Sequence, residues 1–365
     1  MRAAVFREPG SPLVIEEVQL DAPGPGEIRV RIEAAGVCHS DYHYMTGDIA
    51  CPLPIVLGHE GAGIVEALGE GAGEKVKVGD RVALLWRPRC GKCEACVTGN
   101  PVLCQFGRVL AQTGGLLDGT SRLHEGDEKV HHFLGVSCFA EYSVVSESSV
   151  VVVPDGVPPE VAAIAGCAVI TGVGAAFNAV HDAAGRPLVV FGAGGVGLSA
   201  VMGAQLIGAN PIVVVDMDDA RLDLAKQIGA THVVNAADGR TVEKVLDILP
   251  TGAPWVIEAI GRPDTMQQAF ATVGPAGTLV AIGLGRGDAS FAVPVNELVQ
   301  RQKKVVGSLY GSSNPLVDLP RIFELYLAGK LPLDALLGDR LPLAEVNEGY
   351  HQLTHGAIGR TVLIP

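Results

Sequence analysis

The stretch Leu188–Gly197, LVVFGAGGVG, decides the fold of one half of the chain. Its four apolar residues, Leu188–Phe191, predict a buried strand, and the glycine-rich turn and apolar run that follow predict a tight turn and a helix. A second apolar run, IVVVD, ends at Asp216 and predicts the next strand. The sequence therefore predicts a strand, turn, helix and strand that belong to a parallel sheet.

The turn itself has the pattern GxGxxG, and this spacing suits phosphate binding. Glycines permit the tight turn, let the backbone approach a pyrophosphate and allow the helix to pack closely on the strand, while the helix N-terminus faces the phosphate charge. A bare glycine pattern also occurs in turns of other purpose, but here it lies between a strand and a helix. We expect dinucleotide binding by Gly192, Gly194, Gly195, Val196 and Gly197.

Asp216 bears on the choice of dinucleotide, because it lies at the distance where an acid hydrogen-bonds the adenosine ribose. A carboxylate there accepts hydrogen bonds from the free hydroxyls of NAD and repels the 2′-phosphate of NADP. The next residue, Met217, is not the arginine that often receives that phosphate, and Arg221 is expected along the ribose. The sequence therefore favours NAD.

The pattern around this unit predicts two domains, as the length of 365 residues also does. Beyond Thr171, strands such as THVVN, WVIEAIG, GTLVAIG and KKVVGSLY alternate with helical stretches, which predicts a doubly wound, six-stranded parallel sheet with helices on both faces. From Met1 to about Gly166 the runs are short, β-rich and broken by turns. From Tyr310 onward, two helical runs and a closing strand, RTVLI, are expected to pack on the first domain.

Composition excludes several classes of protein. The net charge of −13, without a visible basic cluster, argues against binding to nucleic acid or to an anionic membrane. No stretch approaches about 20 unbroken apolar residues, and the first residues lack the pattern of a signal peptide. We therefore expect a cytoplasmic location, where the eight cysteines would remain reduced and metal binding is a better first interpretation than disulfides.

Four cysteines lie within fifteen positions, and their spacing is typical of a closed zinc site. In CGKCEAC, followed after seven residues by a fourth thiol, the set is Cys90, Cys93, Cys96 and Cys104. Four thiolates on one loop form a tetrahedral structural site that leaves no position for a substrate. The alternative is that these thiols are incidental, which the rarity of cysteine disfavours.

A second candidate metal site is dispersed along the chain: Cys38 in GVCHSD, His59 with Glu60 in GHEGAG, and Cys167 in AGCAVITG. Each residue alone is more often core packing than a ligand. Together, two thiolates and one imidazole would leave a fourth position open, as a catalytic zinc requires, and this ligand set is known for alcohol dehydrogenases. Asp41 and Glu60 are then expected as outer carboxylates that orient His59 or approach the metal.

These residues, with EAIGRPDTM, GCAVITGVGAA and the terminal GRTVLIP, show that the sequence resembles the zinc-dependent medium-chain alcohol dehydrogenases over essentially its whole length. The resemblance implies a GroES-like, β-rich catalytic domain interrupted by a Rossmann domain, with the active site in the cleft between them. The catalytic domain would comprise residues 1–168 and 310–365, with a structural zinc lobe at about 88–106. The Rossmann domain would comprise residues 169–309.

The resemblance also implies roles for individual residues. Cys38, His59 and Cys167 would hold the catalytic zinc, with Glu60 beside it, so that with the four-cysteine lobe each chain would bind two zinc ions. Ser40 would accept the alcohol proton, which would pass through the nicotinamide ribose to His43 and on to solvent. Further cofactor contacts would come from His39, Thr171, Leu284 and Arg360.

The loop from Arg108 to Gly135 resembles that of the dimeric, liver-type and glutathione-dependent formaldehyde-oxidising branch, which implies a homodimer. Arg108 corresponds to an anion-binding arginine of that branch, and Asp48 to one of its two glutathione-contacting acids. Ala50 replaces the second acid, which weakens the case for a glutathione adduct. The resemblance also implies an apolar substrate pocket, with Ser40, Trp86, Phe139 and Leu284.

The sequence therefore predicts an NAD-dependent zinc alcohol dehydrogenase that transfers hydride between nicotinamide and a primary or aromatic alcohol, or its aldehyde. The alternative within the superfamily is a thiol-adduct formaldehyde dehydrogenase or S-nitrosothiol reductase. An alternative of another class is a non-catalytic protein that binds a nucleotide or is only stabilised by zinc. Such a protein would have lost the open metal site, but the residues of that site are all present here.

Overall fold

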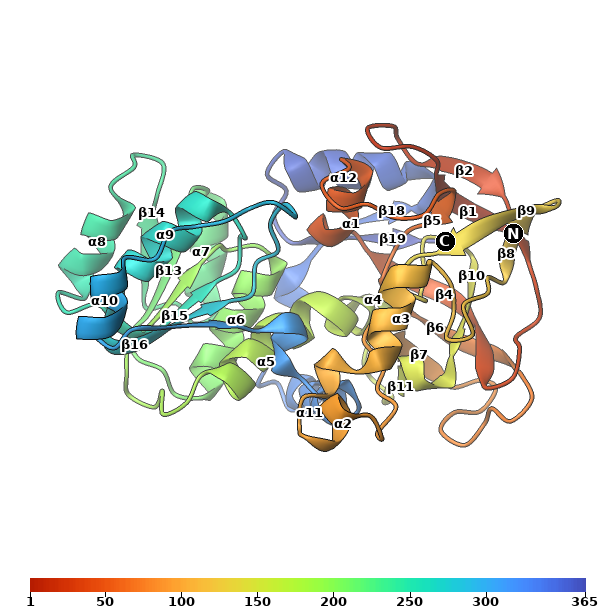
Figure 1. Cartoon of the computed structure of the whole chain (residues 1–365), viewed down its shortest axis with the longest axis horizontal. Coiled ribbons are helices and arrows are strands. Elements are labelled where there is room, and N and C mark those ends of the chain that lie inside the picture. Colours follow the sequence, from red (N-terminus) through yellow and green to blue (C-terminus); the bar gives the residue numbers. More distant parts are fainter. The chain divides into compact units, whose positions relative to one another are not determined.

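The computed structural model describes residues 1–365 and consists of two compact units. Unit 1 comprises Met1–Cys167, Asn314–Gly329 and Leu337–Pro365, and unit 2 comprises Ala168–Ser313 and Lys330–Leu336. The chain thus leaves unit 1 after Cys167, builds most of unit 2 without interruption, returns at Asn314 and enters unit 2 again for the short segment Lys330–Leu336. Figure 1 shows the course of the chain by colour.

The strands are β1 (Arg2–Phe6), β2 (Val14–Glu17), β3 (Gln19–Leu20), β4 (Glu27–Gly36), β5 (Ile55–Val56), β6 (Glu60–Leu68), β7 (Arg81–Leu84), β8 (Leu123–Glu125), β9 (Glu128–His132), β10 (Tyr142–Ser146), β11 (Val150–Val152), β12 (Leu188–Phe191), β13 (Ile212–Asp216), β14 (His232–Asn235), β15 (Ala253–Glu258), β16 (Val273–Ala281), β17 (Lys304–Gly307), β18 (Leu337–Pro342) and β19 (Arg360–Ile364).

The α-helices are α1 (His39–Met45), α2 (Glu94–Val97), α3 (Gln105–Thr113), α4 (Pro159–Ile164), α5 (Ile170–Gly174), α6 (Gly195–Leu206), α7 (Asp219–Gln227), α8 (Thr241–Ile248), α9 (Pro263–Ala271), α10 (Val295–Gln300), α11 (Pro315–Leu327) and α12 (Val346–Thr354). Two π-helical turns, Ala165–Val169 and Ala175–Ala179, adjoin α5. Short 3₁₀ helices are Pro101–Leu103, Glu147–Ser149, Leu309–Ser312, Leu333–Leu336 and Leu343–Glu345.

Unit 2 is built on a six-stranded sheet with the order β14-β13-β12-β15-β16-β17. Every neighbouring pair in it is parallel. The order reverses direction beside β12, where the chain crosses from β14 to β15, and ligands of such sheets bind outside the carboxyl ends of the strands at this point. The predicted doubly wound, six-stranded Rossmann sheet is confirmed.

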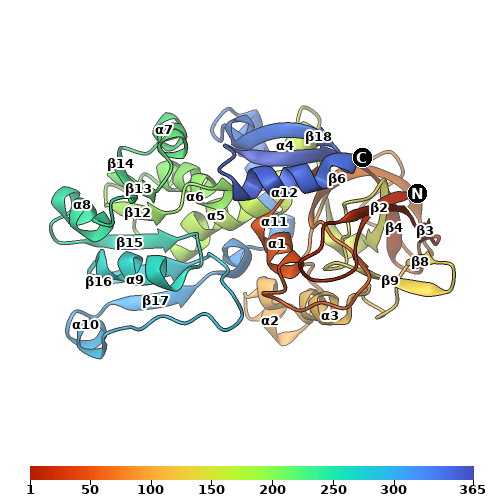
Figure 2. The ribbon, with the colours of Figure 1, turned by 90° about the horizontal axis from the view of Figure 1, so that it is seen from above.

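Helices cover both faces of this sheet because its strands are apolar on both sides. Val189 and Phe191 pack into a buried cluster with Val245 of α8 and Phe270 of α9. The intervening Val190 points the other way, toward α6, which contacts β12, β13 and β15. Figure 2 shows α5 and α6 on one side of the sheet and α9 on the other.

Helices α5 and α6 pack closely because glycines lie at their contact. A Cβ at Gly203 would lie 2.8 Å from the Cβ of Ala176, and a Cβ at Gly172 would overlap the backbone of α6 at Val196. Such contacts leave no space for a larger side chain. The packing fixes the helix that begins at the glycine-rich turn.

Unit 1 contains two β-sheets, which confirms the expected β-rich, GroES-like domain. One has the order β2-β1-β5-β9-β8-β3, and the other has the order β11-β7-β6-β4-β19-β18, with β10 also paired to β4. In β4, Ile28, Val30 and Ile32 are buried, whereas Arg29 and Arg31 between them are partly exposed. This period of two is that of a strand with one face on the core.

One helical run, Pro159–Ala179, is long and apolar enough to cross a membrane by length and composition. However, 94% of its most apolar window is buried inside the protein. Burial in the core is a sufficient reason for its apolar composition.

Candidate metal centres and active site

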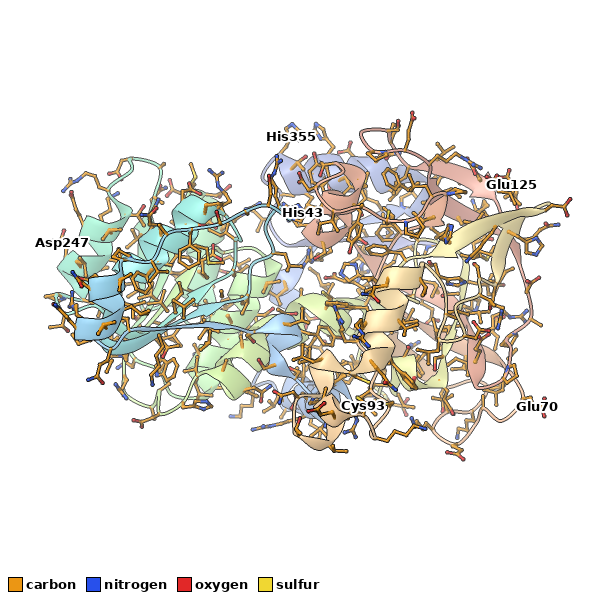
Figure 3. All side chains as sticks on the ribbon, in the orientation of Figure 1. His43, Glu70, Cys93, Glu125, Asp247 and His355 are labelled. Atoms are coloured by element: carbon orange, nitrogen blue, oxygen red, sulfur yellow. The ribbon has the colours of Figure 1, made fainter.

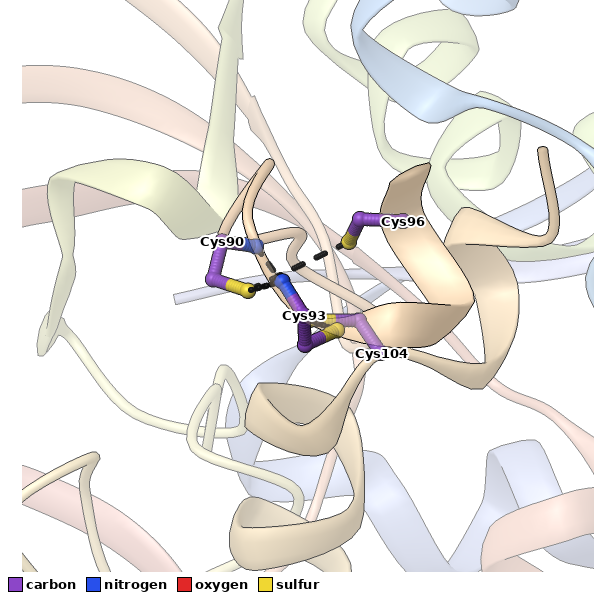
Figure 4. Close-up of side chains that lie close together, drawn as sticks. All are labelled: Cys90, Cys93, Cys96 and Cys104. Atoms are coloured by element: carbon purple, nitrogen blue, oxygen red, sulfur yellow. Dashed lines mark hydrogen bonds between the residues drawn. The ribbon is translucent and has the colours of Figure 1, made fainter. Parts of the chain in front are cut away.

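The four cysteines of the lobe converge on one point, as their spacing predicted (Figure 4). Their sulfur atoms all lie within 4.8 Å of one another, and none forms a disulfide. The Sγ atoms of Cys90 and Cys96 are 4.0 Å apart, and those of Cys93 and Cys104 are 3.8 Å apart. Tetrahedral zinc with Zn–S bonds of about 2.3 Å places its sulfurs about 3.8 Å apart, so the four thiols fit this metal.

Backbone N–H groups of the lobe point at the sulfurs. The N–H of Cys90 donates to Sγ of Cys104 over 3.2 Å, and the N–H of Cys93 donates to Sγ of Cys90 over 3.3 Å. N–H groups of Gln105 and Cys96 lower the pKa of Cys93 to about 6. Such donors favour thiolate, the form that binds metal. Figure 3 shows Cys93 beside α2.

The second group of candidate ligands depends on the pairing of β4 with β6. The two strands are antiparallel, and Gly36 at the end of β4 lies opposite Glu60 at the start of β6. Cys38 follows β4 directly and His59 precedes β6 directly, so the pairing brings both to the same end of the sheet. A side chain at position 36 would overlap the Glu60 carboxyl group, which explains the glycine there.

Cys167 reaches the same place from a helix. Helix α4 contacts both β4 and β6, and the π-helical turn that follows it carries Cys167. Gly166 allows the turn to approach β7, because a Cβ there would lie 2.6 Å from the carbonyl oxygen of Leu84. Insertion of a π turn into a helix is common at functional sites.

The resulting cluster comprises Cys38, His59, Glu60 and Cys167, all buried, with one ligand atom from each lying within 4.8 Å of the others. Sequence reasoning had grouped these four residues, and the structure brings them together. Two thiols and one imidazole are borderline-soft ligands that suit zinc.

Asp41 orients the imidazole of this cluster. Its Oδ1 lies 2.9 Å from Nδ1 of His59 and also accepts the N–H of Gly58 at 3.2 Å. Both side chains are almost fully buried. Because a carboxylate only accepts hydrogen bonds, Nδ1 of His59 carries the proton and Nε2 is left as the ligand atom.

Burial and the contact between the two thiols set the pKa values in this cluster. Burial raises the pKa of Glu60 to about 8, against the opposing effect of the Arg360 guanidinium, whose Nη2 lies 3.4 Å from Oε1. The pKa of Cys38 falls well below its usual value, chiefly because the thiol of Cys167 donates to it. The same contact raises the pKa of Cys167 well above its usual value. The burial of several acidic groups together favours an added cation.

Unsatisfied atoms show that a metal fits this cluster. Nε2 of His59, both carboxyl oxygens of Glu60 and Oδ2 of Asp41 are buried without a hydrogen-bond partner. Buried polar atoms are rarely left without one, so such a set requires an explanation. A zinc ion held by Cys38, His59 and Cys167 would satisfy the imidazole and place a positive charge beside Glu60.

In unit 2, the glycine-rich turn has the conformation that dinucleotide binding needs. Gly192 has a φ of 95°, and a Cβ at Gly197 would overlap the carbonyl oxygen of Gly192. Gly194 is exposed with open space beside it, so a phosphate can approach the backbone at the start of α6. Gly195 and Val196 form the first turn of that helix.

Asp216 at the end of β13 holds this turn. Its Oδ2 accepts the N–H of Ala193 at 2.7 Å, and Oδ1 accepts those of Met217 and Asp218 at 2.8 and 3.1 Å. The carboxylate therefore fixes the loop and retains lone pairs for a ribose hydroxyl. Asp218 caps α7, which carries Arg221.

The remaining predicted residues are positioned as follows. Ser40 and His43 lie on α1, two and five residues after Cys38, and the exposed His39 is the first residue of that helix. Trp86 is buried with its ring edge-on to His59 at 6.0 Å between centroids, and Phe139 is fully buried against Tyr350. Thr171 is buried on α5, and Leu284, after β16, is 48% exposed. Arg360 donates to the carbonyl of Val37, and Arg108 is exposed on α3.

Sequence reasoning missed two aromatic residues of unit 1 and one apolar residue of unit 2. Phe133 packs edge-on against His59 at 5.8 Å, and the buried hydroxyl of Tyr350 on α12 has no hydrogen-bond partner. In unit 2, Ile260 beyond β15 is exposed although apolar. In the sequence, Ile260 could be noticed only because it lies at the end of a predicted strand. No sequence pattern links Tyr350 or Phe133 to His59.

Comparison with known proteins identifies the family. Residues 24–155 match the family model described as "Alcohol dehydrogenase GroES-like domain", and residues 195–324 match the family model described as "Zinc-binding dehydrogenase". It is 39% identical over 368 aligned residues, with 99% of each chain covered, to a protein of Mycobacterium tuberculosis provisionally named alcohol dehydrogenase D.

Two solved structures agree with this match over the whole chain. An alcohol dehydrogenase zinc-binding domain protein from Burkholderia ambifaria shares 34% identity with a TM-score of 0.94. Benzyl alcohol dehydrogenase from Acinetobacter calcoaceticus shares 33% identity with a TM-score of 0.93. In both comparisons 100% of this chain and 98% of the other are covered.

The fold and the thiol clusters thus define a zinc-binding oxidoreductase with a Rossmann sheet. The chain belongs to the zinc-binding medium-chain alcohol dehydrogenase family, as its sequence motifs indicated. That family acts on small alcohols and aldehydes.

The substitution Asp41→Asn should weaken zinc binding by the buried cluster about 10–100-fold, because a neutral amide can still accept from Nδ1–H but no longer supports the imidazole ligand with a negative charge. Competition with a chelator, followed by metal analysis, measures this change. Asp21→Asn is a matched control, since it removes a carboxylate 2.9 Å from Nε2 of His124 at the surface. Equal zinc retention by Asp41→Asn and the wild type would refute the role given to Asp41.

Proposed function

We propose that this protein is an NAD-dependent zinc alcohol dehydrogenase that transfers hydride between nicotinamide and a primary or aromatic alcohol, or the corresponding aldehyde. The convergence of two buried thiols and one imidazole with an unpartnered Nε2 supports this proposal most directly. The proposed catalytic domain comprises residues 1–168 and 310–365, and the proposed NAD-binding domain comprises residues 169–309.

The proposed catalytic zinc is held by Cys38, His59 and Cys167, with Glu60 beside it. Zinc supplies Lewis acidity, which lowers the pKa of an alcohol hydroxyl toward neutrality. Asp41 keeps Nδ1 of His59 protonated, so that Nε2 remains directed at the metal. The lobe of Cys90, Cys93, Cys96 and Cys104 is proposed to hold a second, structural zinc.

Protons leave the proposed site through α1. Ser40 accepts the proton of the alcohol, and His43, farther along the same helix, passes it to solvent. Trp86 and Phe133 surround the His59 ring with apolar surface and exclude water from it.

The proposed cofactor is NAD, bound by Gly192, Gly194, Gly195, Val196 and Gly197 together with Asp216 and Arg221. The partly exposed carboxylate of Asp216 repels a 2′-phosphate and accepts from a free hydroxyl, which favours NAD over NADP. Thr171, Leu284, His39 and Arg360 complete the proposed contacts, the last two at the pyrophosphate.

An aromatic or primary alcohol suits the residues proposed for the substrate pocket. Trp86, Phe139 and Leu284 are apolar, and bulk at Trp86 disfavours branched secondary alcohols. Benzyl alcohol dehydrogenase from Acinetobacter, similar over the whole chain, supports an aromatic substrate. The alternative, a thiol-adduct formaldehyde dehydrogenase or S-nitrosothiol reductase of the liver-type branch, has the exposed Arg108 and the partly buried Asp48 in its favour and Ala50 against it.

A cytoplasmic location is part of the proposal, because a four-thiolate site requires reduced cysteines. We also propose a homodimer formed through β17. This strand is the edge of the six-stranded sheet, and Val305 and Val306 on it are each 38% exposed. Nearby in sequence, α10 exposes Val295 and Val299. An open apolar edge favours pairing with a second copy.

Substrate and cofactor are tested together by assaying alcohols with NAD and NADP in parallel and recording nicotinamide absorbance. We expect benzyl alcohol to be oxidised in preference to branched secondary alcohols. We also expect kcat/KM to be at least about 10-fold higher for NAD, because a like charge at Asp216 costs several kcal/mol. Faster reduction of NADP would refute the cofactor assignment, and a strong preference for S-hydroxymethylglutathione would establish the alternative.

Metal analysis should find two zinc ions per chain. Mild chelation should remove the ion of the open site first, so that activity is lost while circular dichroism and the other zinc are retained. The variant Cys51→Ser, which changes a thiol outside both clusters, should keep both ions. A single zinc per chain in the active enzyme would contradict this assignment.

The variant Val306→Lys should convert the dimer to a monomer, because it places a buried charge at the proposed interface. Sedimentation velocity measures the change. Val78→Lys alters an equally apolar residue that is 58% exposed in unit 1, and it should leave the dimer intact. A Val306→Lys protein that still sediments as a dimer would show that the interface lies elsewhere.

A further inference from the structure

The chain turns back at the end of helix α1, so that residue 48 lies beside residue 43. The helix ends at Met45, and Gly47 follows with a φ of 79°, a left-handed conformation that favours glycine. The N–H of Gly47 donates to the carbonyl of Tyr44, and that of Ile49 donates to the carbonyl of His43, both at 3.1 Å. The side chains of His43 and Asp48 therefore face each other across one tight turn.

The two side chains are in contact. Oδ2 of Asp48 lies 3.2 Å from Nδ1 of His43, and the hydroxyl of Thr46 lies 3.0 Å from the same oxygen. That hydroxyl is also 3.2 Å from the carbonyl oxygens of Tyr42 and His43, so the turn holds it in place. Because a carboxylate only accepts, the proton of a neutral His43 is on Nδ1, and Nε2 carries the lone pair.

Packing fixes this turn in unit 1. The N–H of Gly10 donates to the carbonyl of Met45 at 2.8 Å, and a Cβ at Gly47 would lie 3.2 Å from the Cβ of Pro9. His43 and Asp48 are nevertheless 21% and 23% exposed, so water reaches both. The pair is thus held rigidly and is still open to solvent.

The geometry points to Asp48 as a positioning residue for the proton relay: it holds His43 in the Nδ1–H tautomer and leaves Nε2 as the atom that receives the proton. This inference rests on the proposed function, in which His43 passes the alcohol proton to solvent. Uptake at Nε2 gives an imidazolium whose Nδ1–H remains bonded to Asp48. Release of that proton to water restores the neutral ring, and Asp48 stays a carboxylate throughout.

This role also bears on substrate choice. The family resemblance implies that the acid at position 48 contacts a glutathione adduct. Here, however, the carboxylate accepts hydrogen bonds from two groups of its own turn. An acid that orients the histidine of the relay has the same role with any alcohol, and this role does not require a substrate that contains a thiol. The contact therefore favours simple alcohols over the adduct.

Tautomer measurement tests the inference without reference to activity. In the full-length zinc-loaded protein labelled with ¹⁵N-histidine, the His43 ring should show the Nδ1–H tautomer at a pH where it is neutral. Asp48→Ala should shift His43 toward the Nε2–H form, whereas Asp21→Asn, which breaks the His124 pair, should leave it unchanged. An Nε2–H tautomer in the wild type would overturn the proposal.

Kinetics test whether Asp48 acts through His43. Asp48→Ala should lower kcat for benzyl alcohol about 10-fold with KM little changed, and Asp48→Asn, whose amide oxygen still accepts from Nδ1–H, should restore part of the loss. In a His43→Gln background, Asp48→Ala should have no further effect, because coupled residues are not additive. Additive losses would overturn the proposal.

The outcomes separate this inference from the function on which it rests. If His43→Gln lowers kcat and Asp48→Ala does not, the relay stands and the role of Asp48 is wrong. If alcohol turnover is normal in His43→Gln, both the relay and the role of Asp48 are wrong. If no alcohol is oxidised by the wild type, the proposed function fails, while the tautomer measurement still reports on the His43–Asp48 contact.

Discussion

The antiparallel pairing of β4 with β6 is the constraint on which the candidate active site depends. Because Gly36 lies opposite Glu60, the residues that flank these two strand ends, Cys38 and His59, are forced together, and α4 packed across both strands delivers Cys167. The cluster is buried and acidic, a combination that is costly unless a cation compensates. Arg360 supplies one positive charge within the protein, and the unpartnered atoms of His59 and Glu60 leave a place for a metal.

Carboxylates recur in this protein as groups that hold other groups in place. Asp41 fixes the tautomer of a candidate zinc ligand, and Asp48 contacts the imidazole proposed to release the proton. Asp216 fastens the glycine-rich turn through backbone N–H groups. In each case the acid acts as an acceptor with a defined direction, so that the group which it orients is ready before any ligand binds.

The two thiol clusters show how far local sequence predicts a site. The four cysteines of the lobe are close in sequence, so a short loop is enough to join them, and their spacing predicted a convergence that the structure has. Cys38, His59 and Cys167 are more than a hundred residues apart from first to last, and their grouping came from the ligand types and from resemblance to a family. Their convergence is a property of two strands and a helix, which no local pattern encodes.

The sequence alone determined the six-stranded parallel sheet, its glycine-rich turn and the family, because hydrophobic periodicity and glycine spacing are local consequences of backbone sterics. Tertiary structure decided which aromatic rings lie beside the buried imidazole: Phe133 and Trp86 come from separate segments and meet His59 only when the sheets form. It also decided that Asp48 contacts His43, because that contact depends on a left-handed turn at Gly47 packed on Pro9. Contacts of this kind depend on packing between distant segments, and a single sequence records the residues but not their neighbours.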